Sequence, residues 1–396
     1  MKNQNMSNFF DFVKGHNDFY ARYYEEINSF NTIDELPILT RDIIRKNNLL
    51  TKGFNVSELQ RDTTNGTTEG TPLEVFKTSE EVISLNLALW SVRRKLDCSS
   101  TKRHAYYYYN RSNNEKFSVK ESNNSVIIKL PMNKECANEY LNDLYLLKKY
   151  NINWLIGPPS IIYPLSILAN KHEIGLNVKV VETISEYLPN YYKKEIEKNF
   201  NCKVYIQYSC HEVWGMAYSN ISDELTVMPN MIIEQTVDKR FRRGLGNCIV
   251  TSLQLKSMPF VRYKLTDLIL INGNTLQTYG YRDMESIILD GKVIHCSYID
   301  NLFFDNGYDI KPLNNYQIIY DDEKITFYFL NEPKDLALAV TELFERKIKS
   351  DFDINVKVEY VCTNHFFIDL LAGKMRGILK AQKTNWEFPY NSILNE

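Results

Sequence analysis

Short apolar runs alternate with longer amphipathic stretches between residues 60 and 280, and this alternation limits the folds open to the chain more than any other feature. The apolar runs have the length of buried strands and are rich in Val and Ile. They lie at 125–128, 154–157, 178–181, 204–207 and 249–251, and helix-like stretches lie between them at 138–150 and 187–199. Strands that alternate with helices predict an α/β domain whose sheets are joined by crossover connections.

Different patterns stand on either side of this α/β region. Residues 1–60 show the helical spacing of apolar and aromatic positions, and Thr40 is expected to cap a helix in the basic segment that follows it. Beyond residue 284 the pattern predicts a small α+β domain, with a helix at 334–349 and strands at 285–289, 324–329 and 356–361. We therefore expect an N-terminal domain at 1–283, including the helical region at 1–60, and a C-terminal domain at 284–396.

The composition excludes several classes of protein. With 396 residues, of which 44% are hydrophobic and 24% charged, the chain can form a large core and a second, smaller unit. A net charge of -2 argues against a nucleic-acid partner, and the basic clusters at 93–95 and 239–243 are local. No stretch reaches the roughly 18 apolar residues of a membrane span, and seven scattered cysteines suit a reducing compartment. We expect a cytoplasmic protein that binds neither nucleic acid nor membranes.

Small hydroxyl residues and glycines are concentrated at 63–73. This segment reads TTNGTTEGTPL and contains Thr64, Gly66, Thr67, Thr68 and Gly70. A loop of this composition can close around phosphate oxygens, with backbone N–H and hydroxyl groups as donors. The same composition is typical of an ordinary turn, so the segment alone leaves both interpretations open.

Further motifs occur in a consistent order along the chain. They are LPILTR at 36–41, GPPS at 157–160, TISE at 183–186, YSCHE at 208–212, VTSL at 250–253, MPFVRY at 258–263, Asp267, YRDME at 281–285, DGKVI at 290–294 and AGKMR at 372–376. In this order they resemble the motifs of the adenylate-forming (ANL) superfamily. The resemblance is closer to its phenylacetate-coenzyme A ligase and capsular polysaccharide biosynthesis adenylyltransferase-like branch, and it covers most of residues 36–285.

The resemblance implies both a fold and an activity. The fold would be a large adenylate-forming N-terminal domain followed by a small, mobile C-terminal domain. The activity would be that of an AMP-forming ligase, which uses ATP and Mg²⁺ to convert a carboxylic acid into an acyl-adenylate. The acyl group would then pass to a thiol, either of coenzyme A or of a carrier protein, or to an amine or hydroxyl of a second small molecule. The resemblance also implies a homodimer.

The nucleotide-binding residues of the family correspond to a defined set in this chain. The set comprises Thr64, Gly66, Thr67, Thr68, Gly70, Ser185, Glu186, Tyr208, Asp267 and Arg282. By this resemblance Tyr208 would stack on adenine, and Asp267 would accept hydrogen bonds from the ribose hydroxyls.

Three further residues would take part in catalysis if the resemblance holds. Glu212 would hold Mg²⁺, a hard cation that takes oxygen ligands. Arg262 would lie near the phosphate or organise the adjacent loop. Lys374 would reach the reacting carboxylate and the α-phosphate, a role that suits a flexible point charge.

The acyl pocket of related enzymes corresponds to seven residues here. They are Tyr106, Tyr108, Trp154, Pro158, His211, Trp214 and Ala217. Aromatic walls would favour a flat, aromatic carboxylate. Because the chain contains 27 tyrosines, an aromatic lining is partly expected from composition alone.

The sequence also departs from the family pattern. Asn65 stands where a serine of the phosphate loop is usual, and Glu69 adds an acidic residue to that loop. Ser209 and Tyr281 each replace a glycine. An acidic side chain beside a triphosphate is repulsive unless it points away or meets the metal. These departures motivate an alternative function, a degenerate scaffold protein that binds a nucleotide or acyl-adenylate without turnover.

Overall fold

The structure is a computed structural model of the 396-residue chain. It describes residues 2–27, 32–64, 72–96, 103–108, 117–122, 125–132, 134, 136–220, 224–369 and 373–381. The chain divides into two units, each built from segments far apart in the sequence. The first contains 1–96, 208–237 and 246–277, and the second contains 97–207, 238–245 and 278–396. The domain boundary expected near residue 283 stays a prediction.

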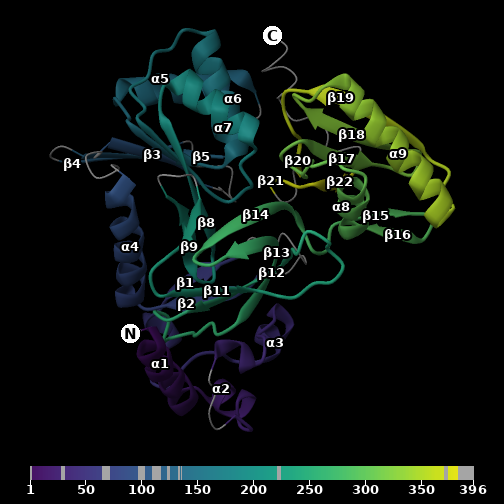
Figure 1. The fold of residues 1–396 in the computed structure, drawn as a ribbon. Coiled ribbons are helices and arrows are strands. Elements are labelled where there is room, and N and C mark those ends of the chain that lie inside the picture. Colours follow the sequence, from purple (N-terminus) through teal and green to yellow (C-terminus); the bar gives the residue numbers. More distant parts are fainter. Residues whose placement is uncertain are drawn as a thin grey trace. The chain divides into compact units, whose positions relative to one another are not determined.

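Short helices open the first unit (Figure 1). They are α1 (Lys2–His16), α2 (Asp18–Tyr23), η1 (Ile33–Glu35), α3 (Arg41–Lys46) and η2 (Val56–Glu58). Thr40 caps α3 as predicted, because its Oγ accepts a hydrogen bond from the backbone N of Ile43 at 3.4 Å. A later helix, α4 (Ser79–Arg93), begins with a capping box formed by Thr78 and Glu81.

Antiparallel strands form the sheet of the first unit. Their order is β11-β12-β13-β14-β10-β9. The strands are β9 (Trp214–Ser219), β10 (Leu225–Val227), β11 (Met231–Gln235), β12 (Gly246–Ser252), β13 (Tyr263–Asn272) and β14 (Thr275–Arg282). All residues of β12 are buried, which explains why the apolar run at 249–251 predicted a strand there. A separate hairpin consists of β1 (Gln60–Thr63) and β2 (Glu74–Lys77).

A largely parallel sheet forms the first part of the second unit. Its order is β8-β7-β6-β3-β5-β4, and only the β4–β5 pair is antiparallel. The strands are β3 (Arg103–Tyr108), β4 (Ser118–Ser122), β5 (Ser125–Pro131), β6 (Trp154–Gly157), β7 (Val180–Thr183) and β8 (Lys203–Cys210). The helices α5 (Ala137–Lys149), α6 (Pro159–Lys171) and α7 (Asn190–Phe200) lie side by side (Figure 1). The predicted α/β class with crossover connections is thus confirmed.

The same unit also contains an α+β part formed by residues 278–381. A hairpin of β15 (Ser286–Leu289) and β16 (Lys292–His295) turns at Asp290 and Gly291, whose φ angles of 50° and 72° suit a tight turn. The helices α8 (Cys296–Asp305) and α9 (Lys334–Phe352) accompany a sheet of order β19-β18-β17-β22. The strands of this sheet are β17 (Tyr316–Tyr320), β18 (Lys324–Leu330), β19 (Lys357–Thr363) and β22 (Ile378–Lys380). A short hairpin of β20 (Ile368–Asp369) and β21 (Lys374–Met375) completes it.

Two predicted element boundaries were wrong. The helix expected at 187–199 begins only at Asn190, because Pro189 takes the extended conformation of an N-cap and the two residues before it stay outside the helix. The strand expected at 178–181 is shifted and runs over 180–183. Its partner in the sheet explains the shift, since pairing with β6 begins at Val180 opposite Trp154. No helix among the described residues combines the length and the apolar character needed to cross a bilayer.

Candidate functional site

The two strands of the β1–β2 hairpin carry the loop that was predicted to bind phosphate. Its residues Asn65, Gly66, Thr67, Thr68, Glu69 and Gly70 lie outside the described residues. The base of the loop is described: the Oγ of Thr64 accepts hydrogen bonds from Leu73 N at 2.8 Å and from Nη2 of Arg41 at 2.7 Å. Thr64 is buried, so its hydroxyl ties both ends of the loop to α3 rather than facing solvent.

Two motifs of the first unit meet side by side. The hydroxyl of Tyr208 donates a hydrogen bond to Oδ2 of Asp267 at 3.1 Å, and the hydroxyl of Tyr263 donates one to Oε1 of Glu212 at 2.9 Å. The segments 208–212 and 263–267 are therefore joined at both ends. Burial, followed by the charge of the partner carboxylate, raises the pKa of both tyrosines well above its ordinary value, so both phenols remain protonated donors.

Glu212 is buried, with 5% of its surface exposed. A carboxylate has two oxygens with about four acceptor positions. The hydrogen bond from Tyr263 uses one of these positions and holds the side chain in one orientation. The donor type and the fixed orientation suit a hard cation such as Mg²⁺.

The guanidinium of Arg262 contacts three groups in the first unit. Its Nη2 lies 3.1 Å from Oε1 of Glu234, and its Nη1 donates to the backbone oxygens of Asp34, at 2.7 Å, and Leu36. Arg262 itself is buried and has a positive φ of 50°. These contacts tie Arg262 to the backbone at residues 34–36. Both of its expected roles, near a phosphate or in organising the adjacent loop, stay predictions.

Sequence reasoning missed a buried lysine next to these motifs. Nζ of Lys77 donates to the backbone oxygen of His211 at 2.9 Å and lies 4.0 Å from Oδ2 of Asp62. Burial lowers the pKa of Lys77. Asp62 also lies 3.3 Å from Nδ1 of His211. The signal was absent from the sequence, since one lysine among 47 basic residues has no distinguishing neighbours.

Other predicted nucleotide and catalytic residues belong to the second unit. Ser185 is exposed with a φ of 70°, and it turns the chain after β7. Glu186 accepts hydrogen bonds from N and Oγ of Ser160 at 3.1 and 3.0 Å and from N of Met375 at 3.3 Å. Lys374 precedes Met375 in β21 and is partly buried.

The predicted pocket residues are divided between the two units. Tyr106 and Tyr108 are partly buried in β3, Trp154 is 1% exposed, and Pro158 is the buried N-cap of α6; these four belong to the second unit. In the first unit His211 is exposed, Trp214 is partly buried and Ala217 is fully buried. An acyl pocket formed by this set stays a prediction.

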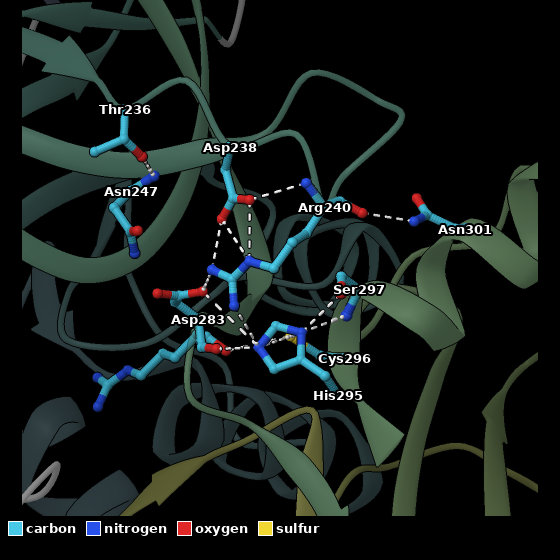
Figure 2. Close-up of polar contacts among 10 residues, drawn as sticks. Thr236, Asp238, Arg240, Asn247, Asp283, His295, Cys296, Ser297 and Asn301 are labelled. Atoms are coloured by element: carbon cyan, nitrogen blue, oxygen red, sulfur yellow. Dashed lines mark hydrogen bonds and ion pairs between the residues drawn. The ribbon is translucent and has the colours of Figure 1, made fainter. Parts of the chain in front are cut away.

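The basic segment at 239–243 is neutralised by acidic partners of the second unit. Figure 2 shows Arg240 between Asp238, 2.6 Å from its Nη2, and Asp283. Next to them, Nδ1 of His295 accepts a hydrogen bond from Ser297 N at 3.1 Å and thereby caps α8. Arg242 and Arg243 pair with Asp305 and Asp309, each at 2.7 Å. The charges of Arg240, Arg242 and Arg243 are thus each paired with a carboxylate of the same unit.

Tyr281, which replaces a glycine of the family pattern, packs against the backbone of Gly377. Tyr281 is fully buried, and its hydroxyl lies 3.0 Å from that of Tyr316. A Cβ on Gly377 would lie only 2.6 Å from Cε1 of Tyr281 and 3.1 Å from Oε2 of Glu285. The ring therefore occupies space that any other residue at 377 would need. Arg282 follows Tyr281 and is partly buried.

Glu285 is buried beside this glycine. It is 6% exposed, and its Oε2 accepts a hydrogen bond from Ile378 N at 3.0 Å. Burial raises its pKa to about 7, although the charges of Arg282 and Arg376 act in the opposite direction. The carboxyl group therefore changes its protonation near neutral pH.

Replacement of Glu285 by Gln is expected to change how stability depends on pH. The carboxyl pKa is about 7 in the folded protein and 4.5 ordinarily, so wild type loses stability from this group as the pH rises from 4.5 to 7. Glutamine has no proton to lose. The unfolding free energy of the variant minus that of wild type should therefore rise by about 2–3 kcal/mol between roughly pH 5 and pH 8. Urea unfolding at each pH measures it.

Glu359→Gln is the matched control for this experiment. Lys324 and Lys357 hydrogen bond to Glu359 at 2.6 and 2.8 Å and lower its pKa to about 2. Glu359 is thus ionised throughout the range, and its variant should show a nearly constant difference from wild type. A constant difference for Glu285→Gln as well would contradict the assigned protonation.

Comparison with solved structures identifies the class of fold. A 2-hydroxyisobutyryl-CoA ligase in the postadenylation state, in complex with R3-HIB-AMP, matches 96% of this chain and 89% of its own, with a TM-score of 0.61 and 14% identity. The same enzyme in an open conformation with 2-HIB-AMP and CoA matches 95% of this chain and 90% of its own, with a TM-score of 0.57 and 14% identity. The chain thus has the fold of this ligase, as the resemblance carried by the motifs predicted.

A sequence relative matches a large part of the chain. Protein CapK of Staphylococcus aureus is 24% identical over 310 residues, which are 72% of this chain and 66% of CapK. The chain therefore spans just under two thirds of that relative's length. No protein-family model matches the sequence.

Proposed function

We propose that the protein is an AMP-forming ligase that activates a carboxylic acid with Mg-ATP and then passes the acyl group to a thiol. The observation that carries the proposal is the double hydrogen-bonded contact of segments 208–212 and 263–267. It brings together, within one unit, residues whose types suit a base, a ribose, and a metal. The fold of a ligase that was solved with an acyl-adenylate and CoA supports the same reaction.

The reaction needs little covalent chemistry from the protein. An oxygen of the substrate carboxylate attacks the α-phosphorus of ATP, the bond from that phosphorus to the bridging oxygen breaks, and pyrophosphate leaves. Two anions must approach each other, so positioning and neutralisation of charge supply most of the acceleration. Mg²⁺, when bound, would neutralise phosphate charge.

The chain's own residues would divide this work. Glu212 would hold the metal through a carboxylate that Tyr263 orients. Asp267 would accept hydrogen bonds from the ribose, and the phenol of Tyr208 would keep Asp267 in position while its ring faces the base. Lys374 would bring a positive charge to the reacting oxygens.

The finer assignments follow the same proposal. We propose an aromatic acid as the substrate, on the strength of the aromatic residues that the resemblance assigns to the acyl pocket; of these, Tyr106 and Tyr108 are partly buried in β3. The first acceptor to test is the thiol of coenzyme A, and a carrier-protein thiol and a small-molecule amine or hydroxyl are the alternatives. Cytoplasmic location and a homodimer remain part of the proposal.

Pyrophosphate exchange with a panel of aromatic and aliphatic acids tests the first half-reaction. We expect incorporation of labelled pyrophosphate into ATP that depends on Mg²⁺ and on one class of acid. Mass spectrometry of products, with and without coenzyme A, then identifies the acceptor. Thermal stabilisation by ATP without exchange for any acid would instead indicate a nucleotide-binding scaffold.

A further inference from the structure

The carboxylate of Glu186 joins two segments of the chain, one that lies 26 positions before it and one that lies 189 positions after it. Its Oε2 accepts from Ser160 N at 3.1 Å, and its Oε1 accepts from Ser160 Oγ at 3.0 Å. Oε1 also accepts from Met375 N at 3.3 Å. All these residues belong to the second unit. Glu186 was expected to contact the nucleotide, yet its side chain is engaged within the protein.

The first of these segments is the N-terminus of α6. N–H groups in the first turn of a helix have no partner inside the helix, and a side-chain oxygen at the N-cap normally accepts from one of them. The N-cap here is Pro158, whose side chain makes no such hydrogen bond. Glu186 takes over this role from outside the helix, because its Oε2 accepts from Ser160 N.

The second segment contains Lys374. The hairpin of β20 and β21 has only two residues in each strand, with Asp369 opposite Lys374 and Ile368 opposite Met375. Such a short hairpin has little stability of its own. The hydrogen bond from Met375 N to Glu186 therefore anchors the backbone directly next to Lys374.

Apolar and polar contacts around the hairpin support the same attachment. Ile368 and Met375 are both 6% exposed and belong to one buried cluster with Ile161 and Ile162 of α6. These contacts pack the hairpin without setting its direction. Gln317 holds the outer ends of the hairpin, because its side chain hydrogen bonds to the backbone of Phe367 and Arg376. The hydrogen bonds of Glu186 are also directional, and they connect the lysine strand to the first turn of α6.

We propose that Glu186 is a positioning residue for Lys374: it fixes the β20–β21 hairpin to the N-terminus of α6 and so sets the place of the lysine within the second unit. This inference rests on the proposed function, because the position of Lys374 matters for activity only if the protein forms an adenylate. In this inference the Glu186 side chain does not contact the nucleotide, and it affects the reaction through Lys374.

The experiment compares Glu186→Ala and Glu186→Gln in the full chain. Alanine removes all three hydrogen bonds. Glutamine keeps Oε1, which accepts from Ser160 Oγ and Met375 N, and loses only the bond from Ser160 N. We expect alanine to lower kcat of pyrophosphate exchange by about 10–100-fold with little change in KM for ATP. Glutamine should restore most of the activity.

Two measurements separate positioning from other roles. Hydrogen exchange of a peptide containing Met375 should accelerate in Glu186→Ala and stay near wild type in Glu186→Gln. The double variant Glu186→Ala with Lys374→Ala should be no slower than Lys374→Ala alone, because the two residues act as one unit. Glu197→Gln is the matched control: Glu197 accepts from Val204 N at 3.1 Å in the same unit, and its loss should leave exchange at Met375 and kcat unchanged.

Different results would overturn different parts of the inference. Unchanged hydrogen exchange at Met375 in Glu186→Ala, or multiplicative losses of activity in the double variant, would overturn the positioning role. A rise in KM for ATP with constant kcat would restore the direct nucleotide contact. Suppose that hydrogen exchange at Met375 accelerates in Glu186→Ala while Lys374→Ala keeps full activity. Glu186 would then anchor the hairpin, but Lys374 would have no catalytic role.

Discussion

Replacement of Glu212 by Gln is expected to slow acid-dependent pyrophosphate exchange by about 10²–10³-fold, because a neutral amide oxygen is a far weaker ligand for Mg²⁺ than a carboxylate. The fold should tolerate the change. Glutamine has the same shape, and its Oε1 can still accept the hydrogen bond that Tyr263 donates at 2.9 Å. Exchange rates measured over a range of Mg²⁺ concentrations should show a higher metal requirement, with the urea midpoint close to wild type.

Tyr263→Phe is the matched control for Glu212. It removes the hydrogen bond that Glu212→Gln keeps, and it leaves the carboxylate charge of Glu212 in place. We expect a smaller loss of activity, about tenfold or less, since the metal ligand remains and only its orientation is relaxed. If Glu212→Gln kept wild-type rates and the wild-type Mg²⁺ requirement, Glu212 would not be the metal ligand.

Replacement of Arg262 by Ala is expected to lower the unfolding free energy by about 3–5 kcal/mol, as loss of one partner from a buried ion pair usually does. Arg262 is 8% exposed, and its guanidinium serves Glu234 and two backbone oxygens at once. Without it, Glu234 keeps an unpaired charge and the backbone oxygens of Asp34 and Leu36 lose a donor. Urea unfolding followed by tryptophan fluorescence measures the change.

Two further variants test the cause of this loss. Adding Glu234→Gln to Arg262→Ala removes the unpaired charge and should recover part of the stability. Arg45→Ala breaks an ion pair with Asp42 that is 3.8 Å long, with 73% of the Asp42 side chain exposed, and should cost less than about 0.5 kcal/mol. A loss below about 1 kcal/mol for Arg262→Ala would show that the guanidinium does not hold the segment.

Much of the fold could be predicted from the sequence because it depends on local patterns. The strand expected at 154–157 coincides with β6, since a short run with three of its four positions buried, between a turn and a proline, leaves few alternatives. Thr40 capped its helix for an equally local reason. Boundaries were less certain where a proline or a sheet partner decided them, as at Asn190 and Val180.

The candidate site was only partly predictable. Motif order led to Tyr208, Glu212 and Asp267, and these lie among partners that suit their expected roles. The partners themselves could not be found in this way. Tyr263 reaches Glu212 across 51 positions, and Lys77 reaches His211 across 134. Such contacts depend on packing, which a single sequence does not record.

Residue types and their order along the polypeptide established which chemistry this protein can offer, because a side chain carries its charge, donors and acceptors wherever it lies. Folding in three dimensions decided which groups share one place and which are occupied by the protein itself. Glu186 is the clearest case: the motif marks it as a ligand for a nucleotide, and the folded chain directs its oxygens to α6 and to the strand of Lys374. The reason is physical, since a carboxylate removed from water binds the nearest unsatisfied N–H groups, and only the tertiary structure determines which ones are near.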